Sequence, residues 1–222
     1  MTTSTGLRRI GLALILIFVT VFAALSLWHG SSAAWADASA LHARSIVDNW
    51  RDGNGAAFTP QLWQDTHDDL QAALRTTPGN PQLLDDLGFL YAARAQGFGT
   101  PGPGSQALQM QQQLLANAAA SYRAATDLRP TFPYSWAYLA LVKHLQGQRD
   151  TEFWVAFDKA VQYGTNEAGV QPALGQIAFA QWSSLGPDRQ RRIEHMVNTA
   201  QAASKARLLI MAEQNGVTLR RP

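Results

Sequence analysis

The 222-residue chain has 18 Lys and Arg against 16 Asp and Glu, giving a formal net charge of +2, and only 15% of its residues are charged. So small a basic surplus gives no reason to expect nucleic-acid binding. With 46% hydrophobic residues the chain can bury one core, and its lack of cysteine excludes disulfides, thiolate metal ligands and a cysteine nucleophile.

The amino-terminal segment carries the clearest local pattern. Ile10 to Trp28 contains no charge and no proline, and it follows Arg8 and Arg9. As a helix of about 19 residues it would span about 28 Å, which matches a bilayer core. Because basic residues stay on the cytoplasmic side, we expect a signal anchor within residues 1–30, with the amino terminus in the cytoplasm and the rest of the chain outside it.

A cleaved signal peptide is the alternative for this segment. Ala34-Trp35-Ala36 before Asp37 has the small-x-small form of a processing site. The apolar run is longer than the 7 to 15 residues usual in signal peptides, which favours a retained anchor. Both interpretations place the folded part of the chain outside the cytoplasm.

Residues 31–55 are expected to form a helical stalk and a turn. Apolar residues recur three and four apart, as in an amphipathic helix, at Ala36, Ala40, Ala43, Val47 and Trp50. The run Asp52-Gly53-Asn54-Gly55 then predicts a turn.

Residues 56–216 are predicted to form a helical domain. Thr59 and Asn80 each precede a proline, as a capping residue precedes the first turn of a helix. They predict one helix from Pro60 to about Thr76 and another from Pro81 to about Gln96. The run from Gly97 to Ser105 has four glycines and two prolines, which predicts an exposed loop, and it lacks the Gly-Lys-Ser/Thr of a phosphate-binding loop.

Two further helices are expected near the carboxyl terminus. Asn166 would cap the first, whose apolar stripe is formed by Val170, Leu174, Ile177, Ala178, Trp182 and Leu185. Gly186-Pro187 would lead into a last helix with Ile193, Met196, Val197 and Ala200 facing inward, extended by Leu208, Leu209 and Met211. A basic tail would occupy residues 217–222.

The central part of the chain resembles tetratricopeptide repeats. The second-helix pattern of that repeat is matched by Ala118, Tyr122, Ala125 and Pro130, and its first-helix pattern by Leu84, Leu87, Gly88 and Tyr91, and again by Trp136, Leu139 and Ala140. Lys143 stands where the repeat has an aromatic residue. The stretch between Tyr91 and Ala118 is 18 residues longer than the spacing of the repeat allows. The resemblance implies an all-α fold in which a stack of helical hairpins, an α-solenoid, follows the transmembrane helix.

Such a stack has a concave surface formed by the first helices of its hairpins. By resemblance to the repeat family, the groove-facing positions are Gln82, Asp85, Phe89, Tyr134, Leu141 and His144. This mixture of aromatic and polar groups suits an extended peptide or a protein helix. Packing of Phe89 and Leu141 against a neighbouring helix is the competing interpretation.

No motif for catalysis, cofactor binding or metal binding is recognised. The five histidines form no ligand pair, and neither a G-x-S-x-G nucleophile elbow nor a dinucleotide-binding fingerprint occurs. An acidic group formed by Asp65, His67, Asp68, Asp69, Asp85 and Asp86 would suit a carboxylate-dependent polysaccharide hydrolase or lyase, but a solvated helix face explains it better. Trp136, Trp154 and Trp182 lie on apolar stripes, which favours a core role over glycan stacking.

A narrower resemblance concerns Pro133 to Lys143 and Glu152 to Ala160, which are similar to paired helices of the VpsP-type family of bacterial polysaccharide biosynthesis accessory proteins. That resemblance implies a non-catalytic scaffold, anchored in the bacterial inner membrane by a single pass, with its folded domain in the periplasm. The implied partner is a membrane protein of an exopolysaccharide synthesis or export complex. Direct glycan binding, with the polysaccharide itself as partner, is the alternative function.

Overall fold

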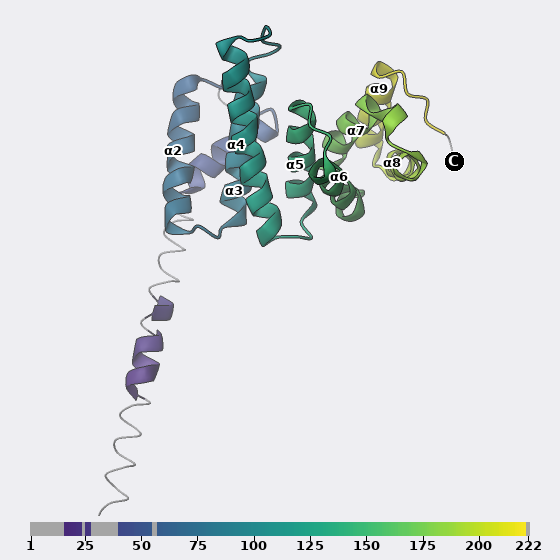
Figure 1. Ribbon diagram of the computed structural model, residues 1–222. Coiled ribbons are helices and arrows are strands. Elements are labelled where there is room, and N and C mark those ends of the chain that lie inside the picture. Colours follow the sequence, from purple (N-terminus) through teal and green to yellow (C-terminus); the bar gives the residue numbers. More distant parts are fainter. Residues whose placement is uncertain (1–15, 24, 28–39, 55–56, 221–222) are drawn as a thin grey trace, which may run out of the picture.

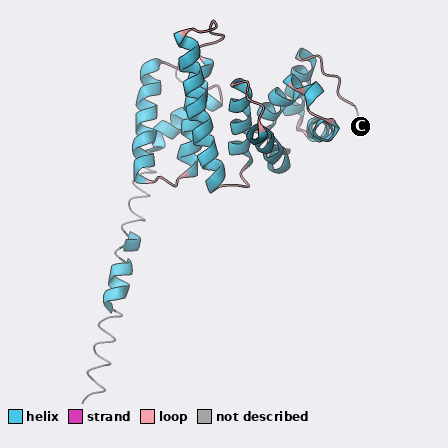
Figure 2. Ribbon diagram, in the orientation of Figure 1, coloured by secondary structure: helices cyan, strands magenta, loops and turns pink. Residues whose placement is uncertain are grey.

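The computed structural model describes residues 16–23, 25–27, 40–54 and 57–220, and all regular secondary structure among them is helical (Figure 2). The expected all-α fold is confirmed. After a helix at residues 40–51 come α2 (Pro60–Thr76), α3 (Pro81–Gln96), α4 (Gln106–Leu128), α5 (Pro133–Leu145), α6 (Thr151–Gly164), α7 (Gln171–Ala180), the 3-10 turn η1 (Trp182–Ser184), α8 (Pro187–Thr199) and α9 (Ala202–Gln214).

The predicted membrane segment is described only in part. Of Ile10 to Trp28, residues 16–23 and 25–27 are described, and all of these are helical. Within the described ranges, no helix is both long enough and apolar enough to cross a membrane. The first part of the expected stalk, residues 31–39, is also outside the described residues.

Thr59 and Asn80 cap their helices as the sequence predicts. Thr59 Oγ1 accepts a hydrogen bond from the amide of Leu62 at 3.2 Å, and Asn80 Oδ1 accepts one from the amide of Gln82 at 3.0 Å. Both helices end where the sequence predicts, at Thr76 and Gln96. The segment 97–105 has no regular structure, in agreement with its glycine and proline content.

The carboxyl-terminal helices differ from the prediction. The helix α7 begins at Gln171 rather than after Asn166 and ends at Ala180, so that Trp182 lies in η1. Pro172 occupies the first turn of α7, where its missing amide proton is not needed. The expected last helix is two helices, because Ala200 has an extended ψ of 148° that ends α8 and lets α9 turn back onto α7 and α8.

The helices form a row that runs in chain order from α2 to α9 (Figure 1). Each helix from α2 to α9 packs on the next one along the chain. From α5 onward, helices also pack on the next but one, in the pairs α5 with α7, α6 with α8 and α7 with α9.

Two hydrophobic clusters form the core. The smaller one joins Ala40, Ala43 and Val47 of the helix at 40–51 to α2 and α3, through Leu70, Ala73, Leu83, Leu87 and Leu90. The helix at 40–51, expected in a stalk, is therefore packed into the helical domain. The larger cluster extends from α3 to α9, and Trp136, Trp154 and Trp182 pack against it half-buried, as their positions on apolar stripes predicted.

Candidate functional site: a tyrosine-lined pocket

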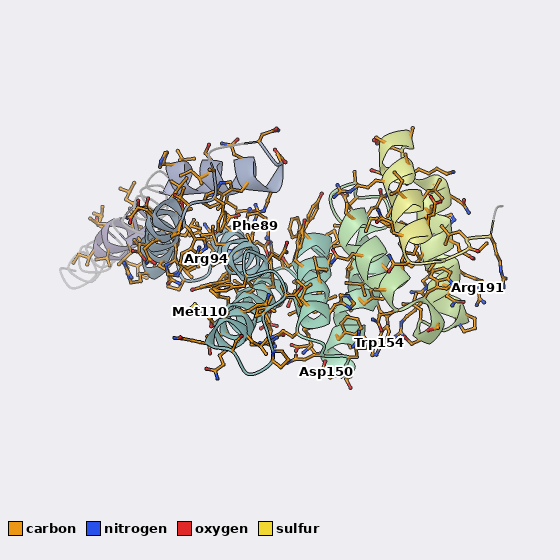
Figure 3. All side chains as sticks on the ribbon, turned by 90° about the horizontal axis from the view of Figure 1, so that it is seen from above. Phe89, Arg94, Met110, Asp150, Trp154 and Arg191 are labelled. Atoms are coloured by element: carbon orange, nitrogen blue, oxygen red, sulfur yellow. The ribbon has the colours of Figure 1, made fainter. Side chains whose placement is uncertain are left out.

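A pocket of about 540 Å³ lies where the helix at 40–51, α3, α4, α5, α7 and α9 meet. We call it the tyrosine pocket. Seen from above, the helix at 40–51 and α9 rise on the same side of the molecule, with α5 between them (Figure 3). The pocket is lined by Arg51, Asp52, Gln82, Asp85, Tyr122, Phe132, Tyr134, Tyr138, Ala168, Gly169, Pro172 and Arg207.

Tyr122 reaches the pocket from α4. Its side chain is only 2% exposed, and its ring stacks on that of Tyr138 with centroids 5.7 Å apart. The ring also lies against Gly88 of α3, where an added β-carbon would be 2.8 Å from ring atoms. Glycine at position 88 therefore makes room for Tyr122. Burial raises the pKa of the Tyr122 hydroxyl well above the usual value. Among the described residues, this hydroxyl has no hydrogen-bond partner.

Tyr134 is positioned in a similar way at the start of α5. Its ring stacks on Phe132, with centroids 5.2 Å apart, and lies against Gly169, whose added β-carbon would be 2.8 Å away. Its hydroxyl donates to Glu167 Oε2 at 3.3 Å. Two tyrosines of this pocket thus rest on glycines, which fixes where their polar ends lie.

Asp85 is buried at the edge of the pocket and is fully engaged. The hydroxyl of Ser135 donates to its two carboxylate oxygens at 2.8 and 3.0 Å, and the guanidinium of Arg129 forms an ion pair with it. Burial raises the pKa of Asp85 to about 6, although Ser135 and Arg129 both favour the ionised form. The carboxylate therefore ties α3 to α5 and to the turn before it.

Arg51 is held by groups on its own side of the pocket. Its guanidinium pairs with Asp86 at 2.8 Å and with Asp48 at 3.1 Å, and it lies 5.0 Å from the centre of the Phe89 ring. Asp86 is 1% exposed, and Arg44 lies 3.5 Å from its second oxygen. Arg51 is consequently neutralised by neighbouring carboxylates.

Arg207 and Asp52 differ from these paired groups. Arg207, on α9, is exposed and makes no ion pair or hydrogen bond with any described residue. Asp52, just after the helix at 40–51, is also exposed and has no ion pair within the described ranges. The pocket thus has an unpaired cation on the α9 side and an unpaired anion on the opposite side.

The structure brings together three of the six predicted groove residues: Gln82, Asp85 and Tyr134 all line the pocket. Phe89 lies beside it, packed on the smaller hydrophobic cluster and against Arg51. Leu141 packs partly buried on the larger cluster, which is the competing interpretation of that residue. His144 is near the other end of α5, about 15 Å along the helix from Tyr134, and its buried Nδ1 has no partner in the described chain.

The sequence missed Tyr122, Tyr138, Arg51 and Arg207. Tyr122 and Gly88 were recognised as repeat positions, but the pattern indicates packing and does not reveal that the hydroxyl reaches a pocket. Arg207 cannot be placed from the sequence, because the apolar pattern predicts one continuous helix where the structure has α8 and α9. Its position depends on the chain reversal at Ala200.

The acidic group proposed for catalysis does not gather at one place. Asp65 and Asp68 are exposed on α2, where they accept hydrogen bonds from Gln61 at 2.8 Å and from Gln64 at 3.0 Å. Asp85 and Asp86 are buried and paired with arginines. Among the described residues, no group of three or more histidines and acids could hold a metal ion.

A second pocket of about 190 Å³ continues the tyrosine pocket toward α9. The two share Ala168, Pro172 and Arg207, and the second adds Ser204 and Leu208. A ligand in the tyrosine pocket can therefore extend past Arg207 along α9.

Comparisons with known proteins assign no family. The chain matches no protein-family model, and a comparison with curated proteins finds no relative.

Proposed function

We propose that the chain is a non-catalytic scaffold whose tyrosine pocket holds an extended segment of a partner protein. By resemblance to the VpsP-type family, the partner belongs to a membrane-bound exopolysaccharide synthesis or export machinery. The apolar run Ile10 to Trp28 would anchor the scaffold in the bacterial inner membrane, with the helical domain on the periplasmic side.

The packing of the helices supports a tetratricopeptide-like α-solenoid. In a solenoid each helix contacts its sequence neighbour within a hairpin and the equivalent helix of the next hairpin. The pairs α5 with α7, α6 with α8 and α7 with α9 follow this rule. Stacked hairpins of this kind offer a concave surface made by alternate helices, which suits extended partners.

The observation that carries the proposal is the pocket itself. It combines aromatic rings, tyrosine hydroxyls and an unpaired arginine in a space of about 540 Å³, a size typical of ligand sites. Tyrosine and arginine are the residues enriched at the centres of protein interfaces. Because the buried carboxylates at and beside the pocket, Asp85 and Asp86, are held in ion pairs, the pocket is better suited to binding than to acid and base chemistry.

The proposal is tested by photo-crosslinking in cells. A benzophenone amino acid is placed at Tyr134, in the pocket, and in a matched strain at Gln112, an exposed position of α4. Irradiation followed by mass spectrometry should recover a membrane protein of polysaccharide assembly from the Tyr134 strain and not from the Gln112 strain. Equal crosslinking from both positions, or no protein adduct at Tyr134, would remove the pocket from the proposal.

Direct glycan binding is the second candidate, favoured by the concentration of aromatic residues around the pocket. Sugars stack on exposed ring faces. Here Tyr134 lies between Phe132 and Gly169, and the Arg129 guanidinium lies 3.9 Å from the centre of the Phe132 ring. These contacts leave edges and hydroxyls toward the pocket, which fits a peptide better than a sugar ring.

A further inference from the structure

The tyrosine pocket contains hydrogen-bond donors that the described chain leaves unused. The hydroxyls of Tyr122 and Tyr138 make no hydrogen bond to a described residue, and Tyr122 is only 2% exposed. Both hydroxyl oxygens are accessible from the pocket, so an acceptor on a ligand can take their hydrogen bonds. Their ring stacking, with centroids 5.7 Å apart, keeps the two side chains together.

The unpaired guanidinium of Arg207 belongs to the same pocket as these donors. Burial raises the pKa of the Tyr138 hydroxyl, and the positive charge of Arg207 opposes that rise in part. Arg51 acts on Tyr138 in the same direction but is already neutralised by Asp86 and Asp48. Arg207 is therefore the cation of this pocket that is available to an incoming anion.

The charge on the opposite side limits what kind of anion fits. Asp52 lines the pocket and is unpaired within the described ranges, so a second negative charge on the ligand would meet repulsion there. Glu167, which accepts a hydrogen bond from Tyr134, is a further negative charge near the pocket. A single carboxylate next to Arg207 is favoured, and an evenly charged polyanion is not.

We propose that the tyrosine pocket binds one carboxylate of an extended peptide, which Arg207 pairs with and the hydroxyls of Tyr122 and Tyr138 donate to. The proposal rests on the proposed function, since it names the chemistry of the partner segment. Charge-assisted hydrogen bonds of this kind are stronger than neutral ones. The carboxylate is supplied by an Asp or Glu side chain or by the carboxyl terminus of the partner.

The peptide continues along α9 beyond the carboxylate. The smaller pocket shares Arg207, Ala168 and Pro172 with the tyrosine pocket and adds Ser204. A side chain on one side of the acid thus meets the partly polar, partly apolar surface between α7 and α9. On the other side of the acid, the peptide lies near Asp52, where a neutral or basic residue is favoured.

The test uses the full chain, purified in mild detergent and immobilised, with two random hexapeptide libraries as probes. One library has amide-capped carboxyl ends and the other has free ones. Bound peptides are sequenced for the native protein, for Arg207→Glu and for the control Arg192→Glu, which reverses an exposed charge on α8. Thermal unfolding of each variant establishes that it is folded.

The native protein and Arg192→Glu should enrich Asp or Glu at one position of the capped library, or bind only peptides with a free carboxyl end. Arg207→Glu should reverse this preference to Lys or Arg. Tyr138→Phe should weaken the selected acidic peptide about tenfold, as expected for a hydrogen bond to a charged group, and leave its Gln or amide analogue unchanged.

Two outcomes would overturn the proposal: no acidic preference in the capped library together with equal binding of the capped and free-ended libraries, or the same preference in Arg207→Glu as in the native protein. Selection of neutral peptides that still compete with a Tyr134 crosslink would refute the carboxylate and leave the scaffold function standing. Absence of any peptide that competes for the pocket would count against both.

Discussion

Gly88 of α3 and Tyr122 of α4 are in direct contact: a β-carbon on Gly88 would lie 2.8 Å from the tyrosine ring. That distance is shorter than real β-carbon contacts, and the ring is otherwise fixed by stacking on Tyr138. The pair therefore sets both the spacing of α3 and α4 and the position of a hydroxyl in the pocket.

Replacing Gly88 by alanine should lower the free energy of unfolding by about 1–3 kcal/mol, the usual cost of overpacking a core. Urea unfolding measures this cost. Gly102→Ala is the matched control, because a β-carbon there meets nothing within 4 Å and its φ is not positive. Equal stabilities of the two variants would mean that Tyr122 can move without cost.

Lys143 should respond asymmetrically to removal of its partners. Its side chain is 4% exposed, and its ammonium lies 2.9 Å from Asp150 and 2.7 Å from Glu152, which are both more exposed. Removing the acids in Asp150→Asn with Glu152→Gln leaves a buried charge unpaired and should cost about 3–5 kcal/mol. The free energy of unfolding of Lys143→Met should be within about 1 kcal/mol of that of the native chain, because this substitution removes the buried charge itself. Chemical unfolding distinguishes the two.

Stability should fall at acid pH through Glu152. Hydrogen bonds from Arg123, and secondarily from Lys143, lower the pKa of Glu152 from 4.5 to about 2. A pKa that is lower in the folded state gives stability that is present above the unfolded value and lost as the pH falls through the folded one. The difference in unfolding free energy between the native chain and Glu152→Gln should therefore shrink from pH 4.5 toward pH 2. A constant difference would contradict the ion pairs.

Asp85 should show the opposite dependence. Burial raises its pKa from 3.8 to about 6, so its contribution is fully present below the unfolded value and is lost as the pH rises through the folded one. Relative to Asp85→Asn, the native chain should lose stability between about pH 4 and pH 6. Ser135→Ala removes a hydrogen bond to the ionised form and should move this window to higher pH, which pH-dependent unfolding can follow.

Local signals predicted the elements from Thr59 to Gln96 because caps and prolines act on their own helix. The chain reversal at Ala200 has no such signal: no proline or glycine marks it, and α9 turns back because Leu208 packs into the core. For the same reason the sequence predicts only some of the residues that line the pocket. Repeat positions identify Gln82, Asp85 and Tyr134, whereas Arg51 and Arg207 reach the pocket from helices outside the repeat pattern.

Lys143 illustrates how a departure from the repeat pattern is accommodated. An ammonium in place of the expected aromatic residue needs anions, and these come from Asp150, which caps α6, and from Glu152 in its first turn. Glu152 also accepts from Arg123 of α4 at 2.9 Å. An ionic network thus joins α4, α5 and α6 where the repeat would use the packing of an aromatic side chain. Its members are distant in sequence, so the residue at position 143 alone does not predict the network.

The most direct test of the scaffold function compares Tyr134→Ala with His144→Ala in the tagged full chain, with co-purified proteins measured by quantitative mass spectrometry. Tyr134 lines the pocket and His144 does not. Both are half-buried on α5, so the two variants share their helix and differ in their relation to the site. Loss of a membrane partner by about tenfold or more in Tyr134→Ala, with native recovery in His144→Ala, is the expected result. Equal recovery in both variants would contradict the proposal that the tyrosine pocket holds the partner.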